Sequence, residues 1–216
     1  MKIALFGAGG EIARRIAREA LSRRHEVVGV VRSAAGYRSD NQREQIVEGD
    51  ATDAASVARV AKGANVIVNA LSPRPSPSGR PASSLAAAAR ALMAGAEQAG
   101  VKRVVVVGGA GTLEVAPGMR LLDSPGFPPA YMPEALEGAA ALDVYRAAPA
   151  DVDWTYISPA AEIGPGERTG HYRRGDDTLL TDANGKSHIS YDDYAIALVD
   201  EIERPTHPRA RMTVAY

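Results

Sequence analysis

A glycine-rich segment near the N-terminus constrains the fold of this chain more than any other feature. Gly7-Ala8-Gly9-Gly10 comes directly after the apolar run Ile3–Phe6 and directly before a stretch of helical periodicity, Glu11–Arg24. In a strand, turn and helix of this kind, the glycines let the backbone come close to a pyrophosphate, and the helix N-terminus offers free N–H groups. The segment therefore predicts the first βα unit of a dinucleotide-binding fold.

Further apolar runs rich in valine and isoleucine alternate with helical patterns along the chain. The runs are Ile3–Phe6, Glu26–Val31, Gln45–Val47, Val66–Ala70, Val104–Val107 and Trp154–Ile157. Later helices are expected over Asp53–Lys62, with Asp53 as the N-cap, and over Pro81–Ala99, followed by Gly100. This alternation predicts an α/β fold, a Rossmann-type doubly wound parallel sheet whose ligand crevice lies at the carboxyl ends of the strands.

The regular alternation ends after Ser158, and a small C-terminal cap region is expected. Cap elements are placed at about residues 112–133 and 160–190, before a helix over Tyr191–Glu203 and a strand at Arg211–Val214. The proline- and serine-rich segment Ser72–Pro81 forms either a lid or an extended surface connection. A length of 216 residues suits one core, so residues 1–216 are expected to form a single NAD(P)-binding domain.

The composition excludes several classes of function. A net charge of -1 leaves no excess of basic residues to bind nucleic acid, and the absence of cysteine excludes thiolate chemistry and disulfides. The four histidines have no metal-ligand spacing, so no metal site is predicted. No apolar stretch is long enough to span a membrane, and we expect a cytoplasmic protein. Nothing in the sequence specifies an oligomeric state.

The candidate cofactor contacts lie at the ends of the predicted strands. Those expected around the pyrophosphate are Gly7, Ala8, Gly9, Gly10, Glu11 and Ile12. Those expected near adenine, ribose and pyrophosphate are Asp50, Ala51, Ala70, Leu71 and Ser72. Those expected at the nicotinamide are Gly108, Gly109, Ala110, Pro159 and Ala160. Asp50 has two interpretations, an acceptor for the adenine amino group or part of an Asx turn before the next helix.

The end of the second strand indicates which dinucleotide is bound. An acidic residue there would bind the ribose 2′-hydroxyl of NAD, but the chain has Arg32 followed by Ser33. A guanidinium matches the 2′-phosphate of NADP, and a serine hydroxyl can add a further donor. NADP(H) is therefore preferred over NAD(H), although Arg32 could instead be a solvated residue at a strand end.

The tyrosines argue against ordinary carbonyl reduction. Short-chain dehydrogenases with that activity use a tyrosine and a lysine four residues later, because the developing alkoxide needs a proton. None of the eight tyrosines is followed by lysine at that spacing. Flavins and quinones accept hydride with delocalisation of the charge, so they need mainly close stacking. A flat conjugated acceptor is therefore expected, with Thr112 and Ser158 as the candidate catalytic residues that position the reactants.

The chain resembles the bacterial NADH-flavin reductase family, an atypical branch of the short-chain dehydrogenases near NmrA-like proteins and biliverdin reductase B. The stretches that carry the resemblance are Lys2–Ala8, Val107–Glu114, Asp153–Ala160, Pro165–Gly170 and Ile189–Ala195. The resemblance implies a Rossmann fold, NADP(H) or NADH as cofactor, and a flavin or quinone-like acceptor, with flavin as a substrate rather than a tightly bound group.

The chain departs from this family at two positions. A threonine commonly follows the first Gly-Ala of the loop in the family, whereas this chain has Gly9. The histidine that biliverdin reductase B places after its sixth strand is missing near Ala160. Because no acid–base group stands out, a non-catalytic redox sensor of the NmrA type is the competing hypothesis. A sugar epimerase would require a lysine beside Tyr131 or Tyr145.

Overall fold

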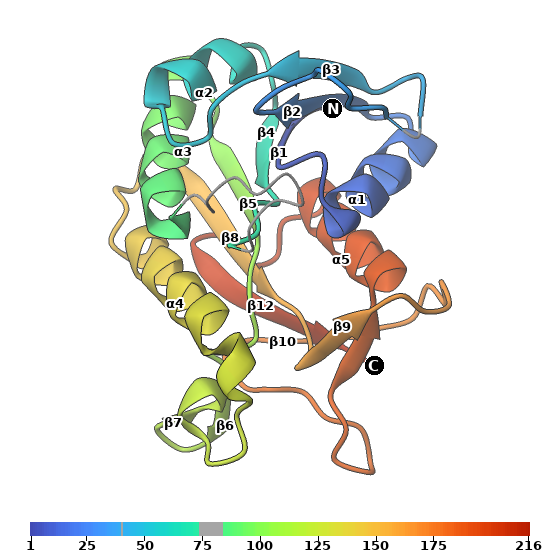
Figure 1. The fold of residues 1–216 in the computed structure, drawn as a ribbon, viewed down its shortest axis with the longest axis vertical. Coiled ribbons are helices and arrows are strands. Elements are labelled where there is room, and N and C mark those ends of the chain that lie inside the picture. The colour runs from blue at the N-terminus through green and yellow to red at the C-terminus, as the bar shows by residue number, and fades with distance from the viewer. Residues whose placement is uncertain (40, 74–83) are drawn as a thin grey trace.

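A single eight-stranded sheet organises the chain in the computed structural model, which describes residues 1–39, 41–73 and 84–216 (Figure 1). Neighbouring strands are parallel except at one edge of the sheet, where β10 (Arg173–Gly175) is antiparallel to β12 (Ala210–Ala215). Across the sheet the order is β10 (Arg173–Gly175), β12 (Ala210–Ala215), β8 (Asp153–Ser158), β5 (Arg103–Val107), β4 (Val66–Asn69), β1 (Lys2–Phe6), β2 (Glu26–Val31) and β3 (Gln45–Glu48). This topology confirms the Rossmann-type prediction, with the strand order reversing between β1 and β4.

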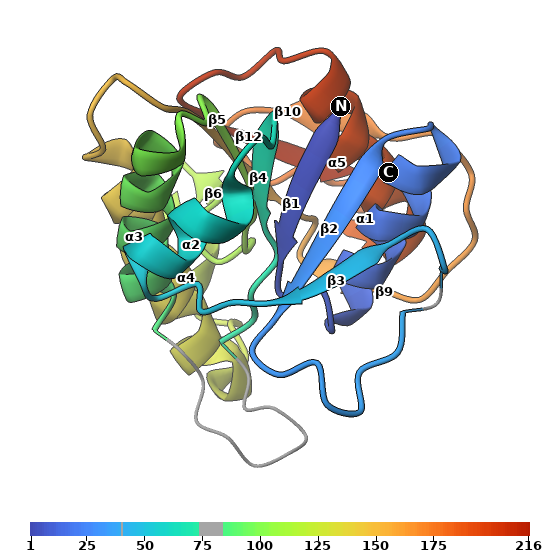
Figure 2. The same ribbon diagram turned by 90° about the horizontal axis from the view of Figure 1, so that it is seen from above.

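Helices cover both faces of the sheet, as Figure 2 shows. One face carries α1 (Glu11–Ser22) and α5 (Tyr191–Glu203), and the other carries α2 (Ala54–Ala61), α3 (Leu85–Ala99) and α4 (Met132–Arg146). Successive strand residues point to opposite faces, so Leu5 packs in the first core and Phe6 in the second. Burial on both faces explains why the inner strands β1, β2, β4 and β5 are mainly apolar.

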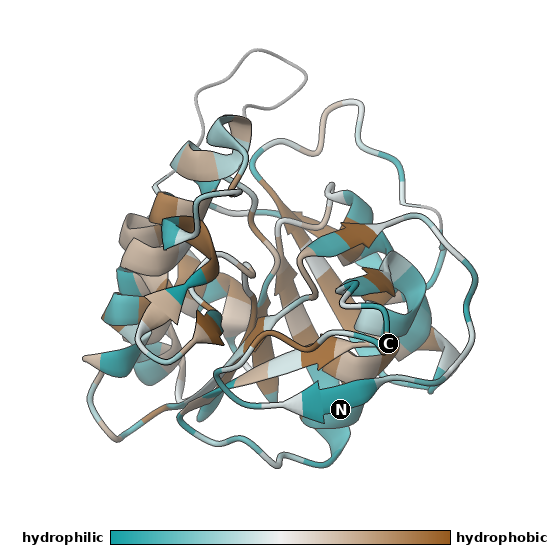
Figure 3. Ribbon diagram, turned by 90° about the horizontal axis from the view of Figure 1, so that it is seen from below, coloured by the Kyte–Doolittle hydropathy of each residue, from teal (hydrophilic) through white to brown (hydrophobic). Residues whose placement is uncertain are grey.

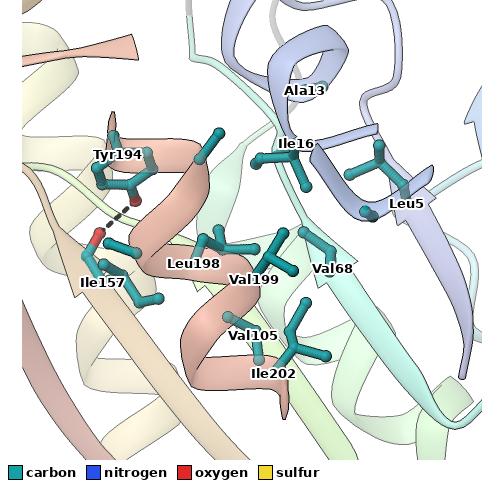
Figure 4. Close-up of a cluster of buried hydrophobic side chains, with 14 of the residues drawn as sticks. Leu5, Ala13, Ile16, Val68, Val105, Ile157, Tyr194, Leu198, Val199 and Ile202 are labelled. Carbon is teal, nitrogen blue, oxygen red and sulfur yellow. Dashed lines mark hydrogen bonds between the residues drawn. The ribbon is translucent and has the colours of Figure 1, made fainter. Parts of the chain in front are cut away.

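The first core joins α1 and α5 to the sheet, and Figure 4 shows its side chains. Ile16 of α1 and Val199 of α5 are fully buried here. Burying one such side chain stabilises the fold by about 1.5–3 kcal/mol. Figure 3 shows the same division across the molecule, with apolar residues concentrated on the strands and polar residues on the loops and outer helix faces. The loops at the carboxyl edge therefore extend from a central sheet that is buried on both faces.

The predicted helix boundaries are largely confirmed by their caps. Asp53 caps α2 by accepting a hydrogen bond from Ala55 N at 3.1 Å. Gly100 ends α3 in the left-handed conformation, with φ +72°. α3 begins at Leu85 rather than Pro81, with Ser84 as its N-cap. Residues 74–83, which include most of the segment Ser72–Pro81, lie outside the described residues.

The sequence does not reveal α4, because its buried side is built largely from small residues. Gly138 and Ala141 face the core with Leu142 and Tyr145, so no broad apolar stripe marks the helix. The remaining short elements fall in the regions expected as caps or beside them. They are β6 (Glu114–Ala116), β7 (Met119–Arg120), the 3-10 turns Leu121–Asp123 and Pro129–Tyr131, β9 (Glu162–Gly164) and β11 (His188–Ser190).

Two buried charges tie the expected cap regions to the core. Arg211 of β12, 6% exposed, donates to Thr112 Oγ1 at 2.8 Å and to Asp177 Oδ1 at 2.7 Å. The buried carboxylate of Asp193 in α5 accepts bonds from Thr169 Oγ1 at 2.7 Å, Gly170 N at 2.8 Å and Tyr216 Oη at 2.6 Å. Each charge therefore holds loops that lie far apart in sequence. No helix within the described residues is long and apolar enough to cross a membrane.

Replacement of Asp193 by Asn should lower the free energy of unfolding by about 1.5–3 kcal/mol, because an amide cannot accept all of these bonds. The matched control is Asp192→Asn. The Asp192 side chain is 22% exposed and lies 3.5 Å from Arg15 and 3.6 Å from Arg18. Its loss should cost about 1 kcal/mol or less. Denaturant unfolding measures both values, and equal losses would contradict the role assigned to Asp193.

The Asp193 contribution should also depend on pH. Burial alone would raise the pKa of Asp193, but hydrogen bonds from Tyr216, Thr169 and Gly170 outweigh it and lower the pKa. A lowered folded-state pKa stabilises the protein above the unfolded value of about 3.9, and this stabilisation is lost as the pH falls. The unfolding free energies of the wild type and Asp193→Asn should therefore differ at neutral pH and converge below about pH 4. A difference that stays constant into acid would disprove the assignment.

Candidate functional site

The glycine-rich turn lies where the strand order reverses, in contact with the end of β4. Gly7 has φ +83°, a conformation that side chains rarely adopt. A Cβ at Gly7 would also stand 2.6 Å from the carbonyl oxygen of Ala70. The N–H groups of Gly7 and Ala8 both point to Val30 O, at 3.2 and 3.3 Å. Only glycine at position 7 therefore lets β1 leave the sheet this close to β4 and turn into α1.

The turn presents a row of open backbone donors. Gly10 N bonds to Gly7 O at 3.0 Å and Arg14 N to Gly10 O at 3.0 Å. Four other N–H groups of this turn have no acceptor within the described part of the chain. They belong to Gly9, Glu11, Ile12 and Ala13. The N-cap residue Gly10 supplies no capping side chain. With the favourable end of the α1 dipole, these donors are suited to bind a pyrophosphate.

Glu11 does not place its negative charge in this anion site. Its carboxylate lies 2.8 Å from Arg15 Nη1, one turn further along α1. The i, i+4 ion pair neutralises the carboxylate and draws it along the helix. The charge repulsion that an acidic residue would cause at the first helical position is thereby reduced.

The end of β2 places the candidate specificity residues at the surface. Arg32 is exposed and Ser33 is half-buried. Asp50 accepts bonds from Thr52 N at 2.8 Å and Thr52 Oγ1 at 2.7 Å, which is the Asx-turn alternative. These Thr52 bonds lower the pKa of Asp50, and the charge of Arg32 lowers it further. Arg32 therefore lies close enough to Asp50 to interact with it, and Ala51 beside them is buried.

The end of β4 is held by the buried side chain of Asn69, which belongs to the segment expected to line the pyrophosphate and ribose. Asn69 Oδ1 accepts from Leu71 N at 3.1 Å, while Asn69 Nδ2 donates to the hydroxyl of Tyr145 in α4 at 3.0 Å. Asn69 thus fixes the backbone of Ala70 and Leu71, the segment that contacts Gly7. Ala70 is buried, and Ser72 is exposed at the start of the following connection.

The ends of β5 and β8 bring bare backbone and small residues together. Gly108 N donates to Ile157 O at 2.9 Å, and a Cβ at Gly108 would meet the Tyr156 ring at 2.2 Å. The Tyr156 hydroxyl accepts from Gly109 N at 3.1 Å. A Cβ at Gly109 would meet no described atom within 4 Å, so one side of this backbone is open. Ala110 is half-buried, whereas Pro159 and Ala160 are buried.

The two candidate catalytic residues differ in their surroundings. Thr112 is half-buried, and its carbonyl and hydroxyl oxygens both accept bonds from Arg211 Nη1, at 2.9 and 2.8 Å. Its hydroxyl hydrogen remains available to donate. Ser158 is fully buried, and its hydroxyl has no hydrogen-bond partner in the described part of the chain. In this conformation the Ser158 side chain is not accessible to a ligand.

The three fully buried tyrosines are not placed to give a proton to a ligand. Tyr145, Tyr156 and Tyr194 are fully buried, and burial raises the pKa of each phenol. The hydroxyl of Tyr156 donates to Gly138 O at 3.2 Å, and that of Tyr194 donates to Ile157 O at 2.7 Å. Within the described residues no hydrogen bond links a lysine to Tyr145 or Tyr131. The described residues also contain no cluster of histidine and carboxylate groups suited to a metal ion.

Two cavities lie beside this site. One of about 190 Å³ is lined by Arg14, Ala17, Arg18, Asn41 and Glu44, next to α1. Another, of about 420 Å³, lies at the amino ends of β1 and β2, around Lys2 and Val27. Segment 74–83, which follows β4, is outside the described residues.

Comparison with known proteins agrees with this geometry. The model of a family described as NAD(P)H-binding matches residues 7–205, from the glycine-rich turn to the end of α5. The chain therefore belongs to the NAD(P)H-binding family, whose cofactor is a nicotinamide dinucleotide. The matched range also includes the β4, β5 and β8 ends that surround the open donors.

Solved structures similar to this chain span its whole length. A "putative exported protein" from Burkholderia pseudomallei is 48% identical with a TM-score of 0.89, and each chain is covered completely. A "putative epimerase" from Bacteroides thetaiotaomicron is 36% identical, with a TM-score of 0.87 and coverage of 100% and 96%. A "putative NADH-flavin reductase" from Streptococcus pneumoniae is 33% identical, with a TM-score of 0.84 and coverage of 100% and 99%. The last similarity confirms the family resemblance seen in the sequence.

Replacement of Gly7 by Ala should both destabilise the protein and abolish cofactor binding. The control is Gly63→Ala, because Gly63 has a similar φ of +75° but open space around a Cβ. Left-handed strain alone should cost about 1–2 kcal/mol at either glycine. The collision with Ala70 O adds to that cost at Gly7 and displaces the turn. Thermal melting and NADPH titration compare the variants, and equal behaviour would show that the Gly7–Ala70 contact does not shape the site.

Proposed function

We propose that this protein is an NADP(H)-dependent reductase that transfers hydride to a flavin or quinone-like acceptor. The observation that carries the proposal is the pairing of open N–H donors at the start of α1 with an uncovered glycine backbone at Gly109. The first feature suits the phosphates of a dinucleotide, and the second suits a flat ring placed against the end of β5. The similarity to a protein named for NADH-flavin reduction supports the same acceptor class.

The acceptor class follows from the groups that the site lacks and those it provides. Bound NADPH supplies the hydride, so the protein needs to hold the two rings in contact and exclude competing reactions. The buried phenols of Tyr145, Tyr156 and Tyr194 are committed to backbone and side-chain bonds. A delocalised acceptor takes its proton from solvent after reduction and requires no phenolic acid. Thr112 is the side chain at the end of β5 that can still donate a hydrogen bond to such an acceptor.

The preference for the phosphorylated cofactor rests on Arg32. A guanidinium at the end of β2 replaces the carboxylate that would select NAD, and its charge already acts on Asp50. The proposal treats residues 1–216 as one NAD(P)-binding domain, in which regions 112–133 and 160–190 cover the acceptor.

Charge reversal of Arg32 to Glu should raise the Kd of NADPH by about 10- to 150-fold, the equivalent of losing one charge-assisted contact. The Kd of NADH should change far less. Arg43→Glu is the control, because Arg43 is also exposed between β2 and β3 but lines the cavity at the amino end of the sheet. An unchanged ratio of the two affinities in Arg32→Glu would refute the 2′-phosphate contact.

A redox sensor is the second candidate, favoured by the burial of Ser158 and the engagement of Thr112 by Arg211. Steady-state oxidation of NADPH in the presence of riboflavin, FMN or a benzoquinone separates the candidates. The reductase proposal predicts turnover with at least one acceptor and a lower kcat for Thr112→Val at unchanged NADPH affinity. Measurable cofactor binding without turnover would reject the reductase and favour the sensor.

A further inference from the structure

The connection between β2 and β3 lays an aromatic ring on the glycine-rich turn. Tyr37 N donates to Ala34 O at 3.1 Å, and Gly36 has φ +77°, which together define a type II turn. The turn folds the chain back toward β1. As a result, the Tyr37 hydroxyl donates to Ala8 O at 3.0 Å, and the side chain is half-buried.

The ring lies directly against Gly9. A Cβ at Gly9 would stand 3.6 Å from Tyr37 Cε2, which is ordinary van der Waals contact. Gly9 also carries one of the open N–H groups of the phosphate-binding turn. Tyr37 therefore borders the same stretch of backbone that the dinucleotide would approach, on the side of the turn nearest the β2–β3 connection.

A cation is fixed on the Tyr37 ring. The guanidinium carbon of Arg14, in α1, lies 5.0 Å from the ring centroid, and Arg14 Nη1 donates to Arg38 O at 3.3 Å. A guanidinium over an aromatic face is held by a cation–π attraction. In the chain, Arg14 directly follows Ala13, the last of the open donors. A second arginine therefore stands by the turn, in addition to Arg32 at the end of β2.

We propose that Tyr37 and Arg14 form a second wall of the adenosine 2′-phosphate site and determine the preference for NADP(H). Tyr37 supplies the surface beside Gly9 and orients Arg14, and Arg14 supplies positive charge that complements the phosphate together with Arg32. The proposal rests on the NADP(H) assignment made above. It adds two specificity residues, one of which acts by positioning the other.

The test measures the Kd of NADPH and of NADH for the full chain and its variants. Arg14→Met should lower the preference for NADPH by about tenfold, the expected loss of one charged contact. Tyr37→Ala should lower it similarly, because Arg14 is then no longer held. The double variant should be no worse than the more affected single variant, since coupled residues are not additive. Tyr37→Phe keeps the ring and should retain the preference.

Arg18→Met is the control for the general loss of positive charge. Arg18 lies on the same helix, its side chain is 60% exposed, and it lies 3.6 Å from Asp192. The control should retain the preference for NADPH. Thermal melting without nucleotide establishes that each variant is folded before its affinities are compared.

Several results would overturn this inference. One is an unchanged preference for NADPH in Arg14→Met and Tyr37→Ala. Another is a loss of this preference in Arg18→Met as large as that in Arg14→Met. A third is tighter NADPH binding in Tyr37→Ala, which would show that the ring obstructs the site. A wild-type protein that binds neither nucleotide would refute the proposed function together with the inference. Binding with the expected variant effects but no turnover would refute only the reductase.

Discussion

The close approach of Gly7 to Ala70 is the constraint on which the rest of the site depends. β1 and β4 are neighbours in the sheet, and the chain leaves them in opposite directions, which opens a crevice at their carboxyl ends. The contact with Ala70 O and the left-handed backbone leave no room for a side chain at Gly7. Once the turn is set, Gly10 ends it and α1 begins with its donors uncovered.

Buried polar side chains arrange the backbone of the site rather than perform chemistry in it. Asn69 and Tyr145 fix the exit of β4, and Tyr156 holds Gly109 N while its ring excludes any side chain at Gly108. A phenol that is fully buried and hydrogen-bonded keeps its proton at any ordinary pH. Residues that would suggest acid–base catalysis from their type alone therefore fix the backbone at the ends of β4 and β5.

Two buried charges help to attach the cap regions to the sheet, beside apolar contacts such as those of Leu113 and Leu180. Arg211 connects Thr112 with Asp177, and Asp193 connects Thr169 with the C-terminal Tyr216. A buried charge is stable only when its hydrogen-bonding capacity is met, so each clamp specifies one loop arrangement. Thr112 thus links the crevice to β12, and its position depends on the geometry of Arg211.

The sequence by itself determined the local elements, because strand and helix periodicity, the Asp53 cap and the glycine at position 100 depend on neighbours along the chain. It also indicated the glycine-rich turn and Arg32. Tertiary structure decided what depends on distant partners. The burial of Ser158, the helix α4 and the placement of Tyr37 on Gly9 had no sequence signal. Each arises from contacts between residues far apart in the chain, which periodicity and spacing do not encode.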